Sequence, residues 1–158
     1  MNTDDYRQIQ NLLYRYAHLL DTGRWDALGQ LFEHADVYIA GELAASKNPA
    51  QLTTLWNSYV RRYPNGTPRT HHIITNVTID DDGEDRARSH CYVLVVQQGS
   101  TLGLQPVIAG DYLDRFEKVE GVWRFTERHI GNELFGNLSE HLLLPMQMPD
   151  DRLPQSWD

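Results

Sequence analysis

The spacing of apolar residues changes once along the chain, and this change constrains the fold more than any other feature of the sequence. Before residue 63 the apolar residues recur at the period of amphipathic helices, about 3.6 residues, and helices are predicted over residues 3–20, 25–32 and 48–62. After residue 69 the pattern is that of strands, predicted over residues 70–80, 85–98, 107–119 and 122–130, with one short earlier strand over 35–42. Helices in one block and strands in another predict an α+β fold, with three helices on one face of an antiparallel sheet. If that sheet curves, it encloses a pocket.

Turn residues separate these predicted elements. Asp21, Thr22 and Gly23 end the first helix with a glycine suited to the position after a helix, and Thr3 or Asp4 can cap its start. Short glycine-containing connections, residues 81–83 and 120–121, join consecutive long strands as hairpins.

The length of the chain predicts one domain. It has 158 residues and no internal repeat or Gly/Ser linker, so we expect a single domain over residues 1–135 and a tail over residues 136–158. The tail contains one apolar patch, residues 142–144, and several prolines. We expect it to cover the mouth of the pocket or a subunit interface.

Charge and composition exclude several functions. With 22 acidic residues against 14 Lys and Arg, the net charge is −8, the wrong sign for binding nucleic acid. The chain contains one cysteine and no long apolar run, and its first ten residues do not resemble a signal peptide, so we expect a cytoplasmic protein without a membrane partner. No P-loop or GxGxxG motif occurs, so no nucleotide cofactor is predicted.

Asp21 and Tyr16 are candidates for chemistry because both can face the space between the helices and the sheet. Asp21 follows the apolar stripe of the first helix, and burial would raise the pKa of its carboxyl unless it has a partner. The alternative is that Asp21 is simply a polar residue of the helix-terminal turn, and Tyr16 a core residue.

His71 and His72 lie in the first long strand and therefore point to opposite faces of the sheet. The alternation of their neighbours leaves open which of them faces the helices. A histidine that shares a pocket with an aspartate would be suited to general-base work, because the carboxylate fixes the imidazole tautomer. A structural or exposed histidine is the alternative.

Other chemistries have weaker support. No HExxH motif or spaced Cys/His set indicates a metal site, and no GxSxG motif indicates a serine nucleophile. Cys91 lies within a strand and is expected to be a small core residue. The acidic residues 80–85 lack the spacing of a calcium loop and are expected to form a solvated hairpin.

Three segments of the chain resemble the SnoaL-like branch of the nuclear-transport-factor-2-like superfamily, whose fold is also called cystatin-like. They are YRYAHLLDTGRWDALGQLF, RTHHIITNVTIDDDGEDRA and GDYLDRFEKVEGVWRFTERHI, in this order. The resemblance implies a cone-shaped α+β domain with a pocket. It does not choose a function, because this superfamily contains dehydratases, isomerases, cyclases, hydrolases and noncatalytic subunits.

Within this superfamily the pattern is most similar to scytalone dehydratase, bile-acid 7α-dehydratase and hexachlorocyclohexane dehydrochlorinase. The resemblance implies that Asp21 and His72 form a catalytic pair, with Tyr16 at the position of a catalytic tyrosine. The second histidine or aspartate that two of these enzymes carry on the next strand has no counterpart, because the only polar residue of that stretch on the inward alternation is Gln97. The aspartate base of ketosteroid isomerases is also absent, from residues 38–40.

The leading hypothesis is therefore a cofactor-independent lyase, in which His72, oriented by Asp21, removes a proton while Tyr16 or a water protonates the leaving group. Tyr38, Trp56, Gln97 and Tyr112 are expected to line a pocket for a small cyclic, largely apolar molecule. The alternatives are a ligand-binding or oligomer-forming subunit, such as a ring-hydroxylating dioxygenase β subunit, and a cyclase or hydrolase in which Asp21 activates water. In each case we expect a homodimer or homotrimer.

Overall fold

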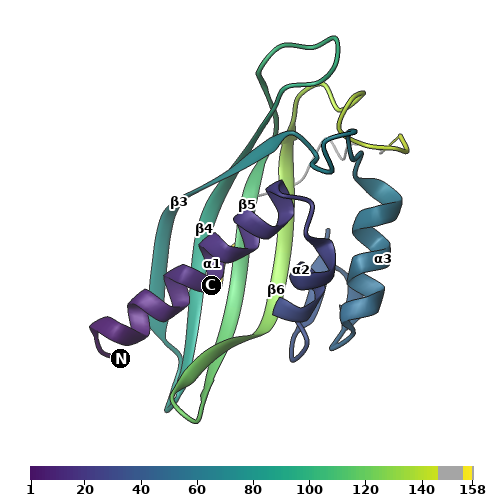
Figure 1. Cartoon of the computed structure of the whole chain (residues 1–158). Helices are drawn as coiled ribbons and strands as arrows, with labels where there is room; N and C mark the ends of the chain where they lie inside the picture. Colours follow the sequence, from purple (N-terminus) through teal and green to yellow (C-terminus); the bar gives the residue numbers. More distant parts are fainter. Residues whose placement is uncertain (146–154, 158) are drawn as a thin grey trace.

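The computed structural model describes residues 1–145 and 155–157, and it has the predicted α+β architecture, with helices and sheet in separate layers (Figure 1). The helices are α1 (Thr3–Asp21), α2 (Trp25–Leu31) and α3 (Pro49–Tyr59). The strands are β1 (Asp36–Ile39), β2 (Glu42–Ser46), β3 (Thr70–Asp81), β4 (Arg86–Gln97), β5 (Gln105–Val119) and β6 (Val122–Phe135). The predicted fold class is confirmed.

The strands form one curved, unclosed six-stranded sheet in the order β2-β1-β6-β5-β4-β3. Strands β3 to β6 form a meander of antiparallel neighbours. The expectation of a purely antiparallel sheet is wrong at one place, because β1 runs parallel to β6. Parallel neighbours need a long connection between them, and here β2, α3 and the three intervening strands provide it.

The predicted strand over residues 35–42 exists but is too long, because residues 36–39 alone form β1. β1 ends at Ile39, and the chain reverses through Ala40 and Gly41, which have positive φ angles of 56° and 82°. Two successive residues with positive φ make the tight reversal that joins hairpin strands, and β2 pairs antiparallel with β1. The same geometry recurs at the predicted hairpin between β5 and β6, where Glu120 and Gly121 have φ angles of 51° and 83°.

Local signals explain most helix ends. The cap of α1 is Asn2, not Thr3 or Asp4, because the Asn2 side chain accepts a hydrogen bond from the Asp5 N–H and the Asp5 carboxylate accepts one from the Asn2 N–H. Gly23 follows α1 with a φ angle of 69°, as the turn prediction requires. The backbone of Gly66 packs so closely against Gly23 that a side chain there would collide with it.

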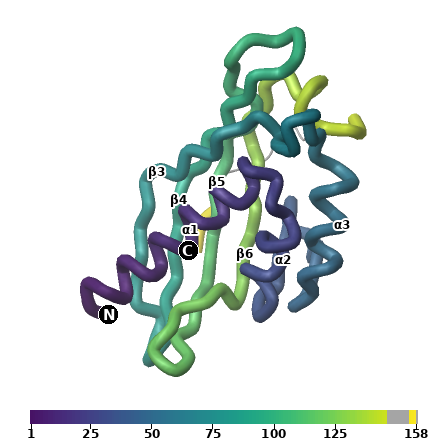
Figure 2. Tube along the Cα trace, viewed as in Figure 1, coloured from purple at the N-terminus to yellow at the C-terminus, as the bar shows by residue number. Residues whose placement is uncertain are grey.

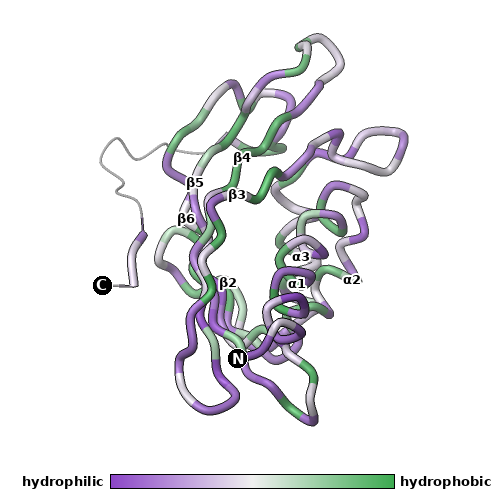
Figure 3. The backbone as a smooth tube through the Cα atoms, turned by 90° about the vertical axis from the view of Figure 1, so that its left-hand side faces the viewer, coloured by the Kyte–Doolittle hydropathy of each residue, from purple (hydrophilic) through white to green (hydrophobic). Residues whose placement is uncertain are grey.

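The core lies between the helices and the inner face of the sheet. Figure 3 shows the helices on one side of the curved sheet, with apolar residues on the surfaces that face each other. Trp25, Leu28 and Phe32 from the α2 region pack with Phe116 and Phe125 from the sheet, and all five are almost fully buried. These side chains fill the space between α2 and the sheet.

Part of the predicted tail lies beside the end of α3. Figure 2 shows residues 136–145 next to this helix end, and Val60 and Leu142 form an antiparallel bridge there. Farther along, Gln155 and Trp157 contact the outer face of the sheet, where the Trp157 indole N–H donates to the Ser89 carbonyl. Residues 146–154 and 158 of the predicted tail lie outside the described residues.

Candidate functional site

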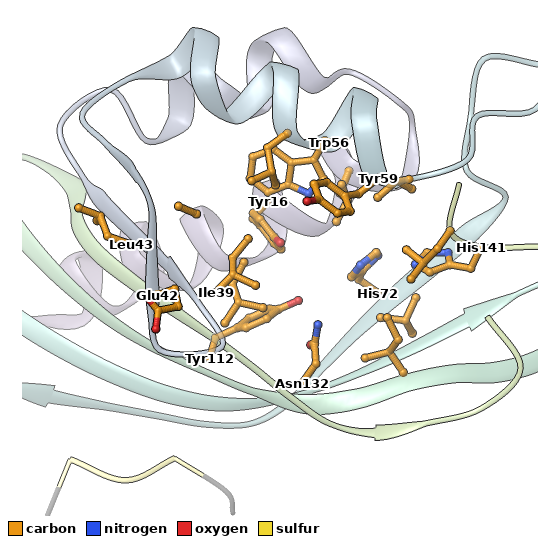
Figure 4. A pocket seen from close by; sticks show the side chains of 18 residues that line it. Tyr16, Ile39, Glu42, Leu43, Trp56, Tyr59, His72, Tyr112, Asn132 and His141 are labelled. Atoms are coloured by element: carbon orange, nitrogen blue, oxygen red, sulfur yellow. The ribbon is translucent and has the colours of Figure 1, made fainter. Parts of the chain in front are cut away.

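A cavity of about 380 Å³ lies between the helices and the inner face of the sheet (Figure 4). Its lining is mostly apolar and comes from α1, the β1–β2 hairpin, α3, strands β3 to β6 and the tail. The lining residues are Tyr16, Leu20, Ile39, Glu42, Leu43, Ala44, Leu55, Trp56, Tyr59, Val60, His72, Val95, Ile108, Tyr112, Ile130, Asn132, His141 and Leu142.

Asp21 and His72 meet at the wall of this cavity. Asp21 is the last residue of α1 and His72 the third residue of β3, and Nδ1 of His72 lies 2.5 Å from Oδ1 of Asp21. The backbone N–H of His72 donates to Oδ2 of Asp21 at 2.8 Å, and the Thr70 hydroxyl donates to Oδ1 at 2.7 Å. Both side chains are buried, with exposed fractions of 8% for His72 and 10% for Asp21. The Asp21 carboxylate therefore joins the end of the first helix to the start of β3.

The surroundings of Asp21 keep it ionised. Burial by itself raises the pKa of this carboxyl, but the hydrogen bonds and charge of His72 and the Thr70 hydroxyl outweigh burial and hold the pKa below its usual value. An ionised carboxylate next to Nδ1 favours the imidazole tautomer with its proton on Nδ1. The lone pair of a neutral His72 is then on Nε2, the ring nitrogen that Asp21 does not contact.

Tyr16 and Tyr112 bring two hydroxyl groups to the same cavity. Their rings meet edge to face with centroids 5.5 Å apart, and the hydroxyls share a hydrogen bond. Figure 4 shows both hydroxyls and the His72 ring pointing toward the cavity. Burial raises the pKa of both tyrosines, so each hydroxyl keeps its proton at neutral pH.

A buried ion pair that the sequence analysis did not identify lies behind these tyrosines. Arg128 on β6 donates from Nε and Nη2 to the Asp114 carboxylate on β5, at 2.6 and 2.8 Å, and both side chains are fully buried. The Arg128 guanidinium also lies over the rings of Tyr16 and Tyr112, at 4.2 and 4.5 Å from their centroids. Aromatic faces attract a cation, so this contact holds both rings in place.

Of the four predicted lining residues, Trp56 and Tyr112 line the cavity and the other two do not. Tyr38 stacks on His129 with ring centroids 4.4 Å apart. It does not line the cavity because successive residues of a strand face opposite sides of the sheet, and in β1 Val37 and Ile39 are the residues that face inward. Gln97 is buried as expected, but its amide donates to the Pro68 and Glu140 carbonyls at 3.0 and 3.3 Å. Its role is to connect the end of β4 with the tail.

The remaining chemical candidates lie away from the cavity. His71 points outward, with 84% of its side chain exposed, and touches Asp21 only at 4.0 Å. Cys91 is fully buried, and burial raises the pKa of its thiol to about 12. Within residues 1–145 and 155–157, no group of three or more His, Cys, Asp or Glu side chains is arranged to hold a metal ion. No helix in the described part of the chain is long and apolar enough to cross a membrane.

Three polar residues of the lining were missed from the sequence. Glu42 is the last residue of the predicted strand over 35–42, but it begins β2 instead, and Asn132 lies near the end of β6, beyond the predicted strand. His141 lies in the tail, where no periodic signal exists, and its exposed fraction is 5%. The only available signal for His141 was its place beside the apolar residues 142–144.

Solved structures similar to this chain share its fold. A protein of unknown function from Mycobacterium tuberculosis is 23% identical with a TM-score of 0.67, over 83% of this chain and 77% of that chain. A candidate scytalone dehydratase from Novosphingobium aromaticivorans is 21% identical with a TM-score of 0.64, over 94% and 95% of the two chains. The β subunit of a candidate aromatic-ring-hydroxylating dioxygenase from the same organism is 18% identical with a TM-score of 0.64, over 85% and 94%. At these identities the likeness concerns the fold alone.

The family follows from the sequence itself. Comparison with curated proteins gives no significant match. A family model of the SnoaL-like domain, in contrast, matches residues 1–129, which include all three helices and both members of the Asp21–His72 pair. Because this match spans most of the chain, the protein belongs to the SnoaL-like domain family.

Proposed function

We propose that the protein is a cofactor-independent lyase that eliminates water or a similar leaving group from a small cyclic, largely apolar molecule bound in the cavity. The observation that carries this proposal is the contact of 2.5 Å between Asp21 Oδ1 and His72 Nδ1 at the wall of an apolar cavity. A histidine held in one tautomer, with its second nitrogen unengaged by the carboxylate, is suited to act as a general base.

In the proposed reaction, His72 Nε2 takes a proton from a carbon next to a carbonyl group. The electron pair of that C–H bond forms the new double bond, and the bond from the neighbouring carbon to the leaving oxygen breaks. Asp21 stabilises the resulting imidazolium and keeps the ring oriented. The proton then returns from the imidazolium to the tyrosine hydroxyls or to solvent, so that the enzyme regains its starting state.

The leaving group needs a proton donor, and the Tyr16–Tyr112 pair supports this role. Both hydroxyls border the cavity, and both remain protonated at neutral pH because burial raises their pKa. A leaving hydroxide that takes a proton from this pair departs as water. A bound water molecule is the alternative donor.

The lining supports an apolar substrate of modest size. A cavity of about 380 Å³ falls within the usual range for small-molecule sites, about 300–1,000 Å³. Aliphatic and aromatic residues such as Leu20, Trp56 and Ile108 supply most of its surface. Polar groups are few, which suits a ring system with one or two oxygen substituents.

The test is an elimination assay with monocyclic and bicyclic β-hydroxy ketones and β-halo ketones, followed by the ultraviolet absorbance of the conjugated product. We expect turnover of at least one member of this panel by the wild-type protein, and its loss in Asp21→Asn. Asp111→Asn is the matched control, because Asp111 also contacts a histidine but lies away from the cavity lining. Equal turnover in wild type and Asp21→Asn would falsify the proposed base. No turnover of any compound, despite binding, would favour a noncatalytic ligand-binding or oligomer-forming subunit.

We also propose that the outer face of the sheet joins two copies of the chain. Ile73, Leu94, Ala109 and Leu134 lie opposite one another on four neighbouring strands. Three of these side chains are exposed, Ile73 by 42%, Leu94 by 37% and Leu134 by 64%. A continuous apolar row on a sheet surface is stabilised when a second copy covers it.

A further inference from the structure

A buried ion pair that the proposed reaction does not use lies directly behind the two tyrosines of the cavity. The side chains of Arg128 and Asp114 are both fully buried. Replacing a buried ion pair by apolar side chains of similar volume often leaves a protein equally stable or makes it more stable, so stability alone does not explain such a pair. Its position beside Tyr16 and Tyr112 points instead to a role in the site.

The Arg128 guanidinium is surrounded by aromatic rings on the sides that its partner carboxylate leaves open. Its Nε and Nη2 donate to the Asp114 carboxylate at 2.6 and 2.8 Å, but Nη1 meets no hydrogen-bond acceptor within residues 1–145 and 155–157. The carboxylate therefore binds only one edge of the guanidinium. The neighbouring ring centroids lie 4.2, 4.5, 4.9 and 5.4 Å from its central carbon and belong to Tyr16, Tyr112, Phe125 and Phe32.

A cation in this position favours the ionised form of a neighbouring phenol. Charges interact strongly over a few ångströms in the protein interior, because little water is present to screen them. Burial raises the pKa of Tyr16, and the Arg128 charge opposes this rise. The carboxylates of Asp114 and Asp21 act in the same direction as burial, but each changes the pKa of Tyr16 less than Arg128 does. Arg128 thus makes Tyr16 a stronger acid than burial alone would leave it.

The two tyrosines differ in how they share their hydrogen bond. This bond lowers the pKa of Tyr16 and raises that of Tyr112, as expected when the Tyr112 hydroxyl donates to the Tyr16 oxygen. The Tyr16 proton can then be directed at a ligand, and Figure 4 shows this hydroxyl pointing toward the cavity. The rings of Tyr16 and His72 also meet edge to face, with centroids 6.4 Å apart. Tyr16 therefore lies between the proposed base and the buried cation.

We infer that Arg128 is a positioning residue that makes Tyr16, rather than a bound water molecule, the proton donor to the leaving group. The O–H bond of Tyr16 breaks, its proton binds the departing oxygen, and the Arg128 guanidinium stabilises the phenolate that remains. The imidazolium of His72 then returns its proton to the phenolate. This inference deepens the proposed lyase and rests on it for the leaving group, whereas the effect of Arg128 on Tyr16 can be measured without any substrate.

The test follows the ionisation of residue 16 directly. Tyr16 is replaced by 3,5-difluorotyrosine, whose phenol is more acidic than that of tyrosine, and the ¹⁹F resonance is recorded as a function of pH. The same measurement is made in Arg128→Gln combined with Asp114→Asn, which removes both charges and leaves two amides that can still form a hydrogen bond. We expect the pKa of the fluorinated phenol to rise by at least about one unit in this neutral variant, the lower end of the usual effect of an adjacent charge.

Two further variants separate charge from packing. Arg128→Lys keeps the positive charge without the planar guanidinium and should keep the pKa close to its value in the parent protein. The matched control is Arg124→Gln combined with Glu117→Gln, because Arg124 and Glu117 form a half-exposed ion pair on the same two strands, β6 and β5. Removing this pair should leave the titration of residue 16 unchanged.

The leaving group provides a second measurement once the ketone panel gives a substrate. A departing hydroxide needs a proton, whereas a departing halide does not. The neutral variant of Arg128 and Asp114 should therefore lower kcat for the β-hydroxy ketone by up to about tenfold, the factor that corresponds to one pKa unit, and leave kcat for the β-halo ketone nearly unchanged. Equal losses for both substrates would contradict the role of Arg128.

The outcomes separate this inference from the proposed lyase. An unchanged ¹⁹F titration in the neutral variant, or a change as large in the control pair, overturns the role of Arg128 whether or not the protein is a lyase. A rise of the expected size in a protein that eliminates nothing from the panel leaves Arg128 as the residue that acidifies Tyr16 and overturns only the lyase. If the neutral variant does not fold, the Nε–H resonance of Arg128 in the parent protein decides, because it should shift with the same pH midpoint as the fluorine signal, and a fixed resonance overturns the inference.

Discussion

Two hydrogen-bonded Asp–His pairs lie in the described part of the chain, one on each face of the sheet, and the one on the inner face borders the cavity. On the inner face, Asp21 Oδ1 and His72 Nδ1 are 2.5 Å apart, and both side chains are buried. On the outer face, Asp111 Oδ2 and His90 Nε2 are 3.0 Å apart, and 29% of the His90 side chain is exposed. The two pairs have the same chemical groups but different surroundings.

The difference lies in what else each aspartate contacts. The inner carboxylate is bound by Thr70 and by the backbone of His72, which orient the imidazole toward the cavity. The outer carboxylate is shared with Gln155, whose backbone and side-chain amide both donate to it. The outer pair thus attaches the C-terminal segment to the sheet. An Asp–His contact becomes a candidate site only where the second ring nitrogen has an enclosed space beside it.

The largest expected effect is on turnover. Asp21→Asn should lower kcat for the substrate found in the ketone panel by a factor of about 10²–10⁴, the usual range for general acid–base catalysis. Asp111→Asn should leave kcat unchanged, because this carboxylate has no contact with the cavity. Steady-state kinetics of the two variants measures the contrast, and equal losses in both would remove the functional distinction between the two pairs.

The burial of His141, which lines the same cavity as His72, predicts a pH dependence of stability. The folded-state pKa of His141 is about 4, against an ordinary value of 6.5, so the unfolded chain binds more protons between these values. The free energy of unfolding should therefore fall as the pH drops from about 6.5 to about 4, by about 3 kcal/mol at most. Urea denaturation at several pH values measures this fall.

The matched variant for this measurement is His141→Asn, which cannot titrate in the same range. Subtracting its pH profile from that of the wild-type protein isolates the contribution of His141. If the two profiles run parallel between pH 4 and 6.5, His141 is not the buried neutral histidine that the structure indicates.

A smaller effect is expected on the outer face. Gln155→Ala removes the amide that donates to Asp111 Oδ1 at 2.8 Å and should lower the free energy of unfolding by about 1–2 kcal/mol, because the bond involves a charged acceptor. Turnover should stay at the wild-type level. Gln10→Ala is the control, because Gln10 is exposed and its replacement should change neither the free energy of unfolding nor turnover. If Gln155→Ala also leaves the free energy of unfolding unchanged, Asp111 does not attach the C-terminal segment to the sheet.

The smallest effect on the isolated chain is expected for Leu94→Arg, at the centre of the apolar row on the outer face. A charge on this exposed surface should leave folding intact but prevent a second copy from covering the row. Light scattering coupled to size-exclusion chromatography should show a larger species for the wild type and a monomer for the variant. A monomeric wild-type protein would end the proposal of self-association.

Elements with strong local signals were predictable from the sequence. The apolar period of α1, the glycine that follows it and the Glu120–Gly121 hairpin all depend on residues within a few positions of one another. Strand β2 was missed because its sequence, ELAAS, is short and buries only one of its five side chains. The parallel pairing of β1 with β6 could not be predicted from local patterns, because it joins segments about ninety residues apart in the sequence.

The candidate site was likewise predictable only in part. A resemblance to SnoaL-like proteins indicated Asp21, His72 and Tyr16, whereas strand alternation alone left open which histidine faces inward. Residues whose placement depends on long-range packing were predicted poorly: Tyr38 and Gln97 were expected in the lining and are elsewhere, and His141 was absent from the expectation. Each of these three depends on how β1, β4 or the tail docks against another element.

The sequence by itself therefore determined the α+β class, the order of helices before the strand meander, and the family. These follow from hydrophobic periods and turn residues, whose effects act over a few neighbouring positions. Only the tertiary structure decided which side chains meet at the cavity, because Asp21 and His72 are 51 positions apart and His141 is 69 residues beyond His72. Their contacts depend on the packing of helices against a curved sheet, and that packing is a property of the whole chain.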